Sequence, residues 1–392
     1  MKPFQDITVI EFSTMITASF ATMMMAEQGA RVIKVEPIEL GDPMRGLGTS
    51  KAGISALFAN CNRGKESIRI DLKSDEGHKI VRDLIAGADI VIHNFRPGVM
   101  DQLNLGSDQL RSLDPRLIYM AISGFSSEGP LSGAPAYDPI IQAHAGLTAA
   151  QGADSPAFVR NLICDKVTAY TACQAVTGAL LVRERSGAGQ HIDLSMLDSG
   201  LFFIFPDGFM NNTLLDDDGI NQLPALADLI YELTPTKDGS VTISAATDAQ
   251  RAAVVIALGK EELLADPRFS SLPKLLENMD TFMGILQAAF KEFTTDEILA
   301  RMQEYDVPCA KCLDHEEVIN QAQIEANGTI EVREHPLMGT MRVVRSPAKF
   351  YGRSLEPTGH SPAHGEHTES VLAELGIRPA ELEELQSRGV IG

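Results

Sequence analysis

Residues 7–36 read ITVIEFSTMITASFATMMMAEQGARVIKVE, and this segment sets the fold class. Residues 7–12 are short, apolar and β-branched, which is typical of a buried strand. Residues 17–28 have helical character and end at Gly29, a suitable residue to follow a helix C-terminus. Residues 31–36 then predict a second strand. Strand, helix, glycine and strand within one short segment predict a βαβ unit.

The same alternation continues downstream. Further strands are predicted at 68–72, 88–95 and 117–125, and helices at 75–86 and 165–185. Residues 191–198 predict a strand that leads into a helix. Alternating strands and helices favour a largely parallel sheet that is covered by helices on both faces. The right-handed rule for such crossovers makes this an open, Rossmann-like α/β sheet.

Length and composition allow two domains. The chain has 392 residues, and its 44% hydrophobic content is ordinary for a globular protein. We expect a large Rossmann-like domain over residues 1–215 and a smaller α+β domain over 216–330. A C-terminal segment, 331–392, is expected to return to the large domain.

Charge and cysteine usage argue against several classes of protein. The formal net charge of −20 repels nucleic acid and anionic membrane surfaces. No uncharged apolar run reaches the roughly 20 residues that span a bilayer, and the opening MKPFQDITVIEF lacks the pattern of a signal peptide. The five cysteines suggest no disulfide framework, and the C-x-x-C at 309–312 lacks the second half of a zinc site. We therefore expect a cytoplasmic protein without a metal, a nucleic-acid partner or a membrane partner.

Two short segments have the composition of an anion or nucleotide site. The first is Asn62-Arg63-Gly64-Lys65, where basic side chains beside a glycine could hold a phosphate. The second is Asn94-Phe95-Arg96, at the carboxyl end of a predicted strand, where open α/β sheets bind ligands. A ring and a guanidinium suit an adenine nucleotide there. A solvated basic turn and a simple strand-to-helix turn remain the alternatives.

Asp165 opens the predicted helix 165–185. Aspartate at such a place is commonly a helix cap. A helix N-terminus also stabilises the carboxylate form and offers backbone N–H groups to an anionic oxygen, which would suit a nucleophile. Tyr137 and Asp138 lie upstream, and Asp138 precedes a proline, which is typical of a turn residue.

Together these segments resemble the class III CoA-transferase family, also called the CaiB/BaiF family. The resemblance covers most of the chain and rests on several motifs in a constant order. They are VIKVEPIELGDPMR (32–45), NRGKESIRIDLKSDEG (62–77), ADIVIHNFRPGVMDQL (88–103), ISGFSSEGP (122–130), YDPIIQAHAG (137–146), DKVTAYTACQAVTGALLVRERSGAGQHIDLSMLD (165–198) and GEHTESVLAELG (365–376).

The resemblance implies an acyl-CoA:carboxylate CoA-transferase. The family's acyl-accepting aspartate falls on Asp165, and a tyrosine beside its active site falls on Tyr137. The residues near the CoA moiety would be Arg45, Asn62, Arg63, Lys65, Asn94, Phe95 and Arg96. The substrates implied are a CoA thioester and a small carboxylic acid, with no permanently bound cofactor. The reaction would pass through an aspartyl-acyl anhydride and an aspartyl-CoA thioester, and the protein would be an interlocked homodimer.

Departures from the family pattern leave the acyl substrate open. Many members have Gly-Pro where this chain has Ala18-Ser19, and the oxalate-linked members have glutamine near Ile16. No glycine-rich flap is recognisable between 211 and 240. Formyl or oxalyl transfer is therefore disfavoured.

Three other functions are alternatives to CoA transfer. An α-methylacyl-CoA racemase of the same superfamily is the main alternative, but racemases carry histidine where this chain has Tyr137, and a neutral phenol is a poor proton partner. A nucleotide-dependent dehydrogenase is disfavoured because no G-x-G-x-x-G follows the first strand. A non-catalytic CoA-binding protein stays open, although Asp165 argues against it.

Overall fold

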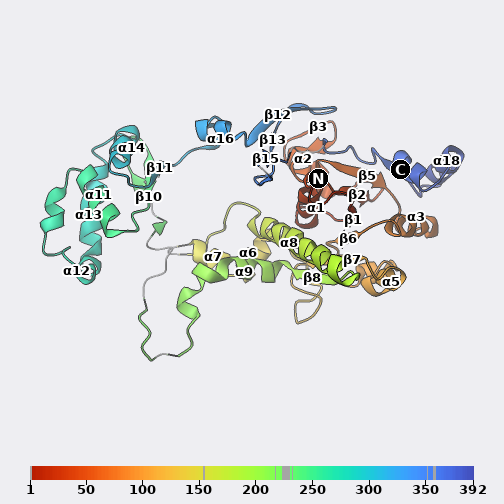
Figure 1. Ribbon diagram of the computed structural model, residues 1–392, viewed down its shortest axis with the longest axis horizontal. Helices are drawn as coiled ribbons and strands as arrows, with labels where there is room; N and C mark the ends of the chain where they lie inside the picture. The colour runs from red at the N-terminus through yellow and green to blue at the C-terminus, as the bar shows by residue number, and fades with distance from the viewer. Residues whose placement is uncertain are drawn as a thin grey trace. The chain divides into compact units, whose positions relative to one another are not determined.

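The chain divides into two units, seen in the computed structural model of Figure 1. The structure describes residues 2–152, 155–216, 218–222, 230–231, 233–350, 352–355 and 359–392. One unit consists of Met1–Pro206 and Glu325–Gly392, and the other of Asp207–Ile324. The sequence placed the corresponding boundaries after residues 215 and 330. Among the helices of the described ranges, none is long and apolar enough to cross a membrane.

A six-stranded parallel sheet forms the centre of the first unit, in the order β5-β2-β1-β6-β7-β8. Its strands are β1 (Thr8–Phe12), β2 (Arg31–Glu36), β5 (Lys65–Arg69), β6 (Ile90–His93), β7 (Ile118–Ser123) and β8 (His191–Ser195). From β1 the chain builds β2 and β5 on one side, then returns to build β6, β7 and β8 on the other. This order confirms the predicted Rossmann-like sheet and makes β1/β6 the topological switch point.

Strand β5 lies three residues earlier than the sequence pattern predicted. The apolar run predicted a strand at 68–72, whereas the paired residues are Lys65–Arg69, with Lys65 opposite Val32 of β2. Lysine at a strand start resembles a loop residue in the sequence. Here its ammonium is neutralised by Glu11 of β1 at 2.8 Å, which allows the charged residue to sit inside the sheet layer.

One face of the sheet is covered by an apolar core. Strand residues such as Ile10, Ile68 and Val91 are fully buried against α3 (Asp75–Ile85) and the C-terminal helices α17 (Thr368–Glu374) and α18 (Pro379–Ser387). α3 begins at a Ser74 cap and presents Ile80 and Leu84 to this core. The C-terminal segment thus packs against the sheet formed by the N-terminal half of the unit.

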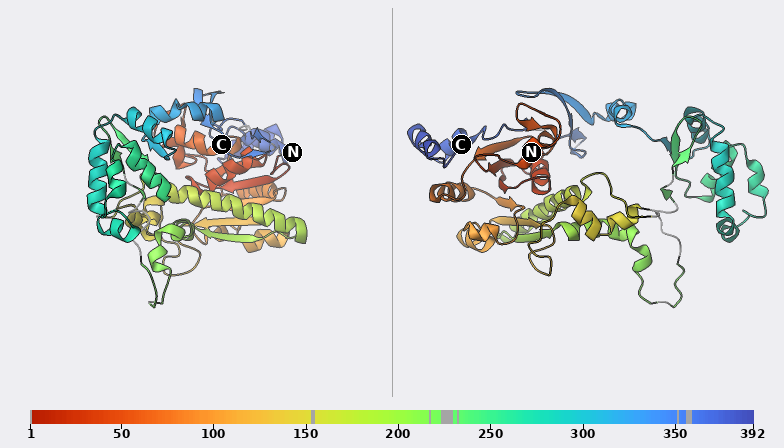
Figure 2. Two further views of the ribbon diagram at one scale, coloured as in Figure 1. Left: turned by 60° about the vertical axis from the view of Figure 1, so that its left-hand side comes forward. Right: turned by 180° about the vertical axis from the view of Figure 1, so that it is seen from behind.

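The opposite face is covered by α1 (Thr17–Glu27) and α8 (Ile163–Ser186), which pack side by side (Figures 1 and 2). Beneath α1 lies a buried ionic cluster. Glu11 contacts the ammonium groups of Lys34 and Lys65 at 2.8 Å each, and Lys34 also contacts Asp42 at 3.0 Å. Burial opposes ionisation of Glu11, but the two lysines outweigh it and hold the pKa of Glu11 well below its usual range. Burial lowers the pKa of Lys65 to about 8.

Shorter elements complete the first unit. They are η1 (Pro43–Gly46), β3 (Ser50–Lys51), β4 (Ile54–Ser55), α2 (Ala56–Asn62), α4 (Val99–Gln102), α5 (Ser107–Leu113), α6 (Asp138–His144), α7 (Leu147–Gln151), α9 (Met196–Gly208), α16 (Ala322–Asn327), the hairpin β12 (Ile330–His335) and β13 (Gly339–Val344), and the hairpin β14 (Lys349–Phe350) and β15 (Arg353–Ser354). Helix α9 ends at Gly208 and α16 begins at Ala322, both within the second unit, so each of these helices crosses a boundary between the units.

The second unit has its own core. An antiparallel sheet, β11-β10-β9, packs with helices around residues such as Val241, Phe290 and Ile298. Its elements are η2 (Met210–Asn212), β9 (Thr234–Pro235), β10 (Ser240–Ile243), α11 (Asp248–Ala257), η3 (Glu261–Ala265), α12 (Leu272–Glu277), α13 (Met279–Phe290), α14 (Thr295–Glu304), β11 (Cys309–Lys311) and α15 (His315–Ile319).

Candidate active site

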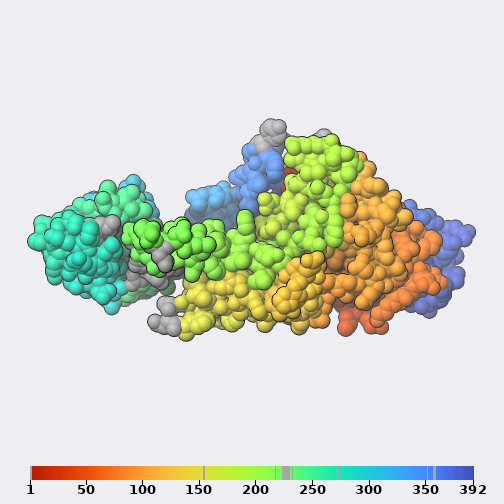
Figure 3. Space-filling model, turned by 90° about the horizontal axis from the view of Figure 1, so that it is seen from below, coloured from red at the N-terminus to blue at the C-terminus, as the bar shows by residue number. Residues whose placement is uncertain are grey.

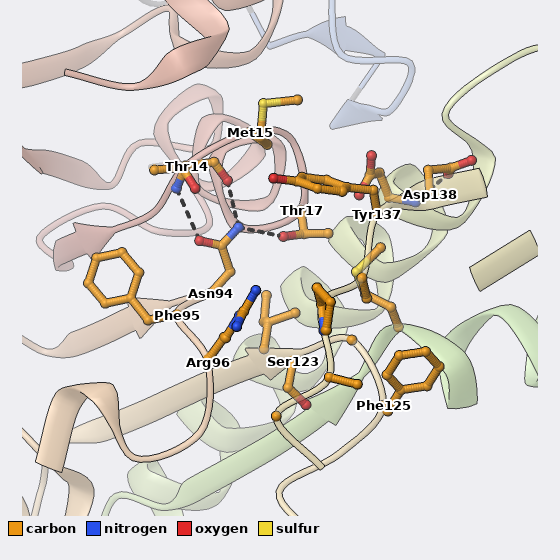
Figure 4. Close-up of a pocket in the computed structure, with 18 of the residues that line it drawn as sticks. Thr14, Met15, Thr17, Asn94, Phe95, Arg96, Ser123, Phe125, Tyr137 and Asp138 are labelled. Carbon is orange, nitrogen blue, oxygen red and sulfur yellow. Dashed lines mark hydrogen bonds between the residues drawn. The ribbon is translucent and has the colours of Figure 1, made fainter. Parts of the chain in front are cut away.

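A pocket of about 430 Å³ opens at the switch point of the sheet (Figure 4). It is lined by residues that follow β1, β6 and β7, together with the starts of α6 and α8. The lining residues used below are Thr14, Thr17, Asn94, Phe95, Arg96, Ser123, Tyr137, Asp138, Asp165 and Met196. A pocket at the carboxyl ends of parallel strands is where open α/β sheets bind ligands.

Asn94 fastens the loop after β6 to the loop after β1. Its amide nitrogen donates to the carbonyl oxygen of Thr14 at 2.6 Å and to Oγ1 of Thr17 at 2.9 Å. Its amide oxygen accepts from the Thr14 N–H at 3.0 Å. Through these three bonds, Asn94 after β6 holds the loop after β1 in place. The two loops together form one wall of the pocket (Figure 4).

The loop after β7 forms another wall of the pocket. In this loop the backbone at Gly124 lies close to the backbone at Ala136. A Cβ placed on Gly124 would lie 2.3 Å from Cβ of Ala136, so no larger residue fits at position 124. Ala136 is followed by Tyr137, which precedes the first turn of α6 and whose side chain is 66% exposed. In Figure 4 the Tyr137 hydroxyl is directed toward the Thr14–Thr17 loop.

Asp165 lies in the first turn of α8 and is 8% exposed. Its backbone N–H donates to Oδ2 of Asp138 at 3.1 Å. Asp138, in the first turn of α6, is 1% exposed, and its Oδ1 accepts from Nε2 of Gln142 at 2.6 Å. Asp138 therefore caps the helix that carries Asp165, and two carboxyl groups line the same pocket.

The environment of Asp165 favours its neutral form. Burial, followed by the negative charge of Asp138, raises the pKa of Asp165 to about 7, while Lys166 acts in the opposite direction. The sequence had favoured a stabilised carboxylate at the helix N-terminus. In the structure, burial and the neighbouring charge of Asp138 act against that stabilisation of the carboxylate.

The backbone of this turn is also largely engaged. The N–H of Ile163 donates to Asn161 O at 2.8 Å, and that of Lys166 donates to Leu162 O at 3.3 Å. With the Asp165 N–H bonded to Asp138, three N–H groups of the turn already have acceptors. The expectation that this turn offers its N–H groups to a substrate oxygen is not supported at these positions.

The predicted site residues fall into two groups in the structure. Asp165, Tyr137, Asn94, Phe95 and Arg96 line one pocket, although they come from three separate segments of the chain. Of the predicted CoA contacts, the other four are buried outside this pocket: Arg45, Asn62, Arg63 and Lys65.

Arg45 and Arg63 each bind a carboxylate inside the unit. Nη2 and Nε of Arg45 donate to Glu36 at 2.6 and 2.9 Å, and its guanidinium lies 3.8 Å from the ring centroid of Phe58. Nε of Arg63 donates to Glu27 at 2.6 Å, and Nη2 donates to Val344 O at 2.9 Å. Both guanidinium groups therefore have local partners that stabilise the fold.

Asn62 and Lys65 form a pair with each other. Nζ of Lys65 donates to Oδ1 of Asn62 at 2.7 Å and to the carbonyl oxygen of Ser19 at 2.8 Å, in addition to its ion pair with Glu11. The amide of Asn62 donates to Phe58 O at 3.1 Å. The assignment of Arg45, Asn62, Arg63 and Lys65 to CoA thus rests on the resemblance alone and stays a prediction.

Sequence reasoning underestimated Asp138. Its place before Pro139 indicated a turn, and Pro139 does stand in the first turn of α6. No local pattern showed that its carboxylate would meet the first turn of a helix that begins 25 residues later. The segment 211–240, where no flap was recognised, lies partly outside the described residues, at 217, 223–229 and 232.

Comparison with known proteins assigns the family. The family described as CoA-transferase family III matches residues 4–368. The chain belongs to CoA-transferase family III. It is 31% identical to an acyl-CoA transferase of Fusarium pseudograminearum, over 98% of this chain and 87% of that protein. It is 30% identical to the succinyl-CoA–D-citramalate CoA-transferase of Chloroflexus aurantiacus, over 100% of this chain and 98% of that one.

The fold agrees with a solved structure of the same family. A CaiB/BaiF family protein from Brucella suis superposes with a TM-score of 0.82 at 29% identity, covering 95% of this chain and 99% of that one. Within the described ranges, this family III transferase has no group of three or more His, Cys, Asp or Glu side chains that could hold a metal ion.

Proposed function

We propose that this CoA-transferase moves CoA from an acyl-CoA donor to a carboxylic acid acceptor, with Asp165 as the covalent nucleophile. The observation that carries the proposal is a buried carboxyl group in the switch-point pocket, on the first turn of a helix that Asp138 holds in place. A carboxylate with a raised pKa is a stronger nucleophile than a free one once it is ionised. Burial also limits water, which would hydrolyse an anhydride or a thioester.

The proposed reaction has two halves. In the first, a carboxylate oxygen of Asp165 attacks the thioester carbonyl, the C–S bond breaks, and CoA leaves as a thiolate. The thiolate attacks the aspartyl carbonyl of the mixed anhydride, releases the donor acid and forms an aspartyl-CoA thioester. In the second half the acceptor carboxylate attacks that thioester and expels the thiolate. The thiolate then attacks the acceptor carbonyl and frees Asp165.

The protonation state of Asp165 follows from its neighbours. With a pKa of about 7, a sizeable fraction of Asp165 is already ionised at neutral pH. The ionised carboxylate carries no proton, so its oxygen lone pairs are available to attack the thioester. We propose that Asn94 and Phe95 border the thioester end of CoA, because these two residues line the same pocket as Asp165. Tyr137 is proposed to lie beside the reacting carbonyl from the opposite wall.

Trapping the intermediate tests the proposal. The protein is incubated with acyl-CoA donors, hydroxylamine is added, and mass spectrometry of peptides locates the modification. We expect a hydroxamate at Asp165, and a loss of turnover of at least about a thousandfold in Asp165→Ala. Asp83→Ala, in an exposed aspartate of α3, serves as the matched control. Turnover that persists in Asp165→Ala, or a label on another residue, would sink the proposal.

The same samples distinguish a racemase. A racemase would exchange the α-proton of a 2-methylacyl-CoA with deuterated water and transfer no acyl group. A transferase forms the aspartyl adduct whether or not the α-carbon bears a proton.

We further propose that the active form is a homodimer, interlocked as the resemblance implies. α9 presents Phe202, Phe203 and Phe205 to solvent at 84, 53 and 43% exposure, and Tyr170 of α8 is 55% exposed. Figure 3 shows a face of the molecule on which the segment from α8 to α9 is at the surface. A run of exposed aromatic side chains on one helix is typical of a subunit interface. A second copy of the chain is the partner that this surface is proposed to take.

A further inference from the structure

Gln142 of α6 joins Asp138 to the segment that leads into α8. Gln142 is buried, with 2% exposure, and both ends of its amide have partners inside the protein. Nε2 donates to Oδ1 of Asp138 at 2.6 Å, and to the carbonyl oxygens of Val159 and Asn161 at 3.0 and 3.1 Å. Oε1 accepts from the N–H of Val159 at 3.0 Å. One side chain thus connects the first turn of α6 with the residues just before α8.

These partners fix the orientation of the Gln142 amide. The N–H of Val159 needs an acceptor, which is the amide oxygen, and the two backbone carbonyl groups need a donor, which is the amide nitrogen. Turning the amide over would place its oxygen against two carbonyl oxygens and its NH2 group against an N–H. Gln142 therefore offers a donor, and not an acceptor, to Asp138.

Asp138 receives a donor at each of its two carboxyl oxygens. Oδ1 accepts from Gln142, and Oδ2 accepts from the backbone N–H of Asp165 at 3.1 Å. Among the described residues, these are the hydrogen bonds of the Asp138 carboxyl group, which is almost fully buried. A carboxylate can accept at both oxygens, whereas a protonated carboxyl group turns one of them into a donor. The two N–H groups therefore favour the ionised form of Asp138.

The carboxyl group of Asp165 has no such support. It is buried in the same pocket as Asp138, and within the described ranges no hydrogen bond reaches its side-chain oxygens. Two neighbouring carboxyl groups do not ionise independently, and a proton that they compete for stays on the group whose ionised form is less stabilised. The hydrogen bonds thus make the two members of the pair unequal.

We propose that Gln142 is a positioning residue that keeps Asp138 ionised, and so assigns the proton of the carboxyl pair to Asp165. This inference rests on the proposed function, in which Asp165 is the nucleophile. Gln142 is absent from the lining of the pocket, so it acts through Asp138 and not on the substrate. Asp138 is then a fixed negative charge, and Asp165 is the member of the pair that gains and loses the proton.

Other titratable and charged groups surround the pair. They are Cys164 and Lys166 on α8, Tyr137 before α6, Arg160 in the segment before α8, and Arg96 after β6. Burial, followed by the charges of the two aspartates, raises the pKa of the Cys164 thiol to about 12, so this thiol stays protonated at neutral pH. The variants used below leave all five groups in place, so that a difference between variants reports on the carboxyl pair.

The pH dependence of kcat/KM in Gln142→Met tests the inference. Methionine has a similar length but no N–H group, so Asp138 loses the donor at Oδ1 and takes up the proton more readily. Asp165 is then ionised at lower pH, and the acid limb should move down by about half a unit to one unit. At pH 5.5, kcat/KM relative to its own plateau should rise about threefold to tenfold. Gln386→Met, in an exposed glutamine of α18, is the matched control.

A double variant shows whether Gln142 acts through Asp138. In Asp138→Asn the negative charge is already absent, so adding Gln142→Met should move the acid limb by less than about 0.2 unit. A purely structural role predicts another result, because a loosened α8 lowers kcat/KM by the same factor at every pH. An acid limb that stays in place in Gln142→Met, or that moves equally in both backgrounds, would overturn the inference.

A titration of the wild type needs no Gln142 variant and no turnover. The aspartate carboxyl carbons are labelled with 13C, and the two resonances are assigned with Asp138→Asn and Asp165→Asn. We expect the Asp165 resonance to move between pH 5 and pH 8 while that of Asp138 stays at its carboxylate position. The reverse pattern would overturn the inference even if the Asp165 adduct forms with acyl-CoA. If no adduct forms with any donor, the proposed function falls, and the role of Gln142 in transfer falls with it.

Discussion

Asp138 and Asp165 are joined by a hydrogen bond from the Asp165 N–H to Oδ2 of Asp138, 3.1 Å long. The bond places a capping carboxylate next to the carboxyl group proposed to react. Asp138 therefore has two opposing effects on Asp165: it fixes the turn that carries the side chain, and its charge disfavours ionisation of that side chain.

Removing the charge of Asp138 should shift the pH dependence of transfer. In Asp138→Asn the side-chain oxygen can still accept from the Asp165 N–H, but the like charge is gone. The pKa of Asp165 should fall from about 7 toward the ordinary range of a carboxyl group, so the acid limb of kcat/KM moves to lower pH by about one unit or more. A pH–rate profile measures the shift, with Asp83→Asn as the control. An unmoved acid limb would show that Asp138 does not set the ionisation of Asp165.

Asp165→Asn should stabilise the protein at alkaline pH. The folded-state pKa of Asp165, about 7, lies above the ordinary aspartate value of 3.8, so the folded state binds more protons between these values. The free energy of unfolding therefore falls as pH rises from about 4 to 7, and asparagine removes this loss. We expect a gain of up to about 4 kcal/mol at pH 8 and almost none near pH 4.

Urea denaturation of wild type and Asp165→Asn at pH 4.5 and pH 8 measures that difference. Asp83→Asn should show no comparable gain at either pH. Equal stability of wild type and Asp165→Asn at pH 8 would mean that the Asp165 carboxylate is not strained by its surroundings.

Glu11→Gln should destabilise the first unit severely. Glu11 is fully buried and contacts both Lys34 and Lys65, so its loss leaves two buried ammonium groups with less compensating charge. Breaking a buried ion pair from one side costs about 3–5 kcal/mol. Chemical denaturation at pH 7 measures the loss, and Glu39→Gln, in an exposed loop glutamate, is the control. A loss below about 1 kcal/mol would mean that the cluster is not enclosed as described.

Phe202→Asp should prevent dimerisation. Phe202 is 84% exposed on α9, where a second copy of the chain is proposed to cover it. A buried carboxylate without a partner would oppose that contact. Light scattering after size-exclusion chromatography should report a dimer for wild type and a monomer for the variant. Leu113→Asp changes a 78% exposed leucine of α5 and should leave the mass of the assembly unaltered. A monomeric wild type would refute the proposed assembly.

The position of the pocket was within reach of the sequence. Strand ends can be predicted from apolar runs, and the residues after them must gather at one edge of a parallel sheet. Asn94, Phe95 and Arg96 were predicted at that edge and do line the pocket. The basic residues of 62–65 were predicted to face a ligand in the same way, yet Arg63 and Lys65 are buried in ion pairs. Both segments combine an asparagine with basic side chains, and the partners of those side chains differ.

The sequence by itself determined the largely parallel sheet and the strand ends that border the pocket, because the periodicity and length of apolar runs follow from local backbone geometry and burial. The strand order, and with it the switch point, came from the tertiary structure. The tertiary structure alone decided which charges are neutralised and which are free. Glu11 meets Lys34 and Lys65 through the register of three strands, and Asp138 meets Asp165 across a gap of 27 residues. Electrostatic energy depends on the distance between charged groups and on the exclusion of water from them. Neither can be read directly from the order of residues along the chain.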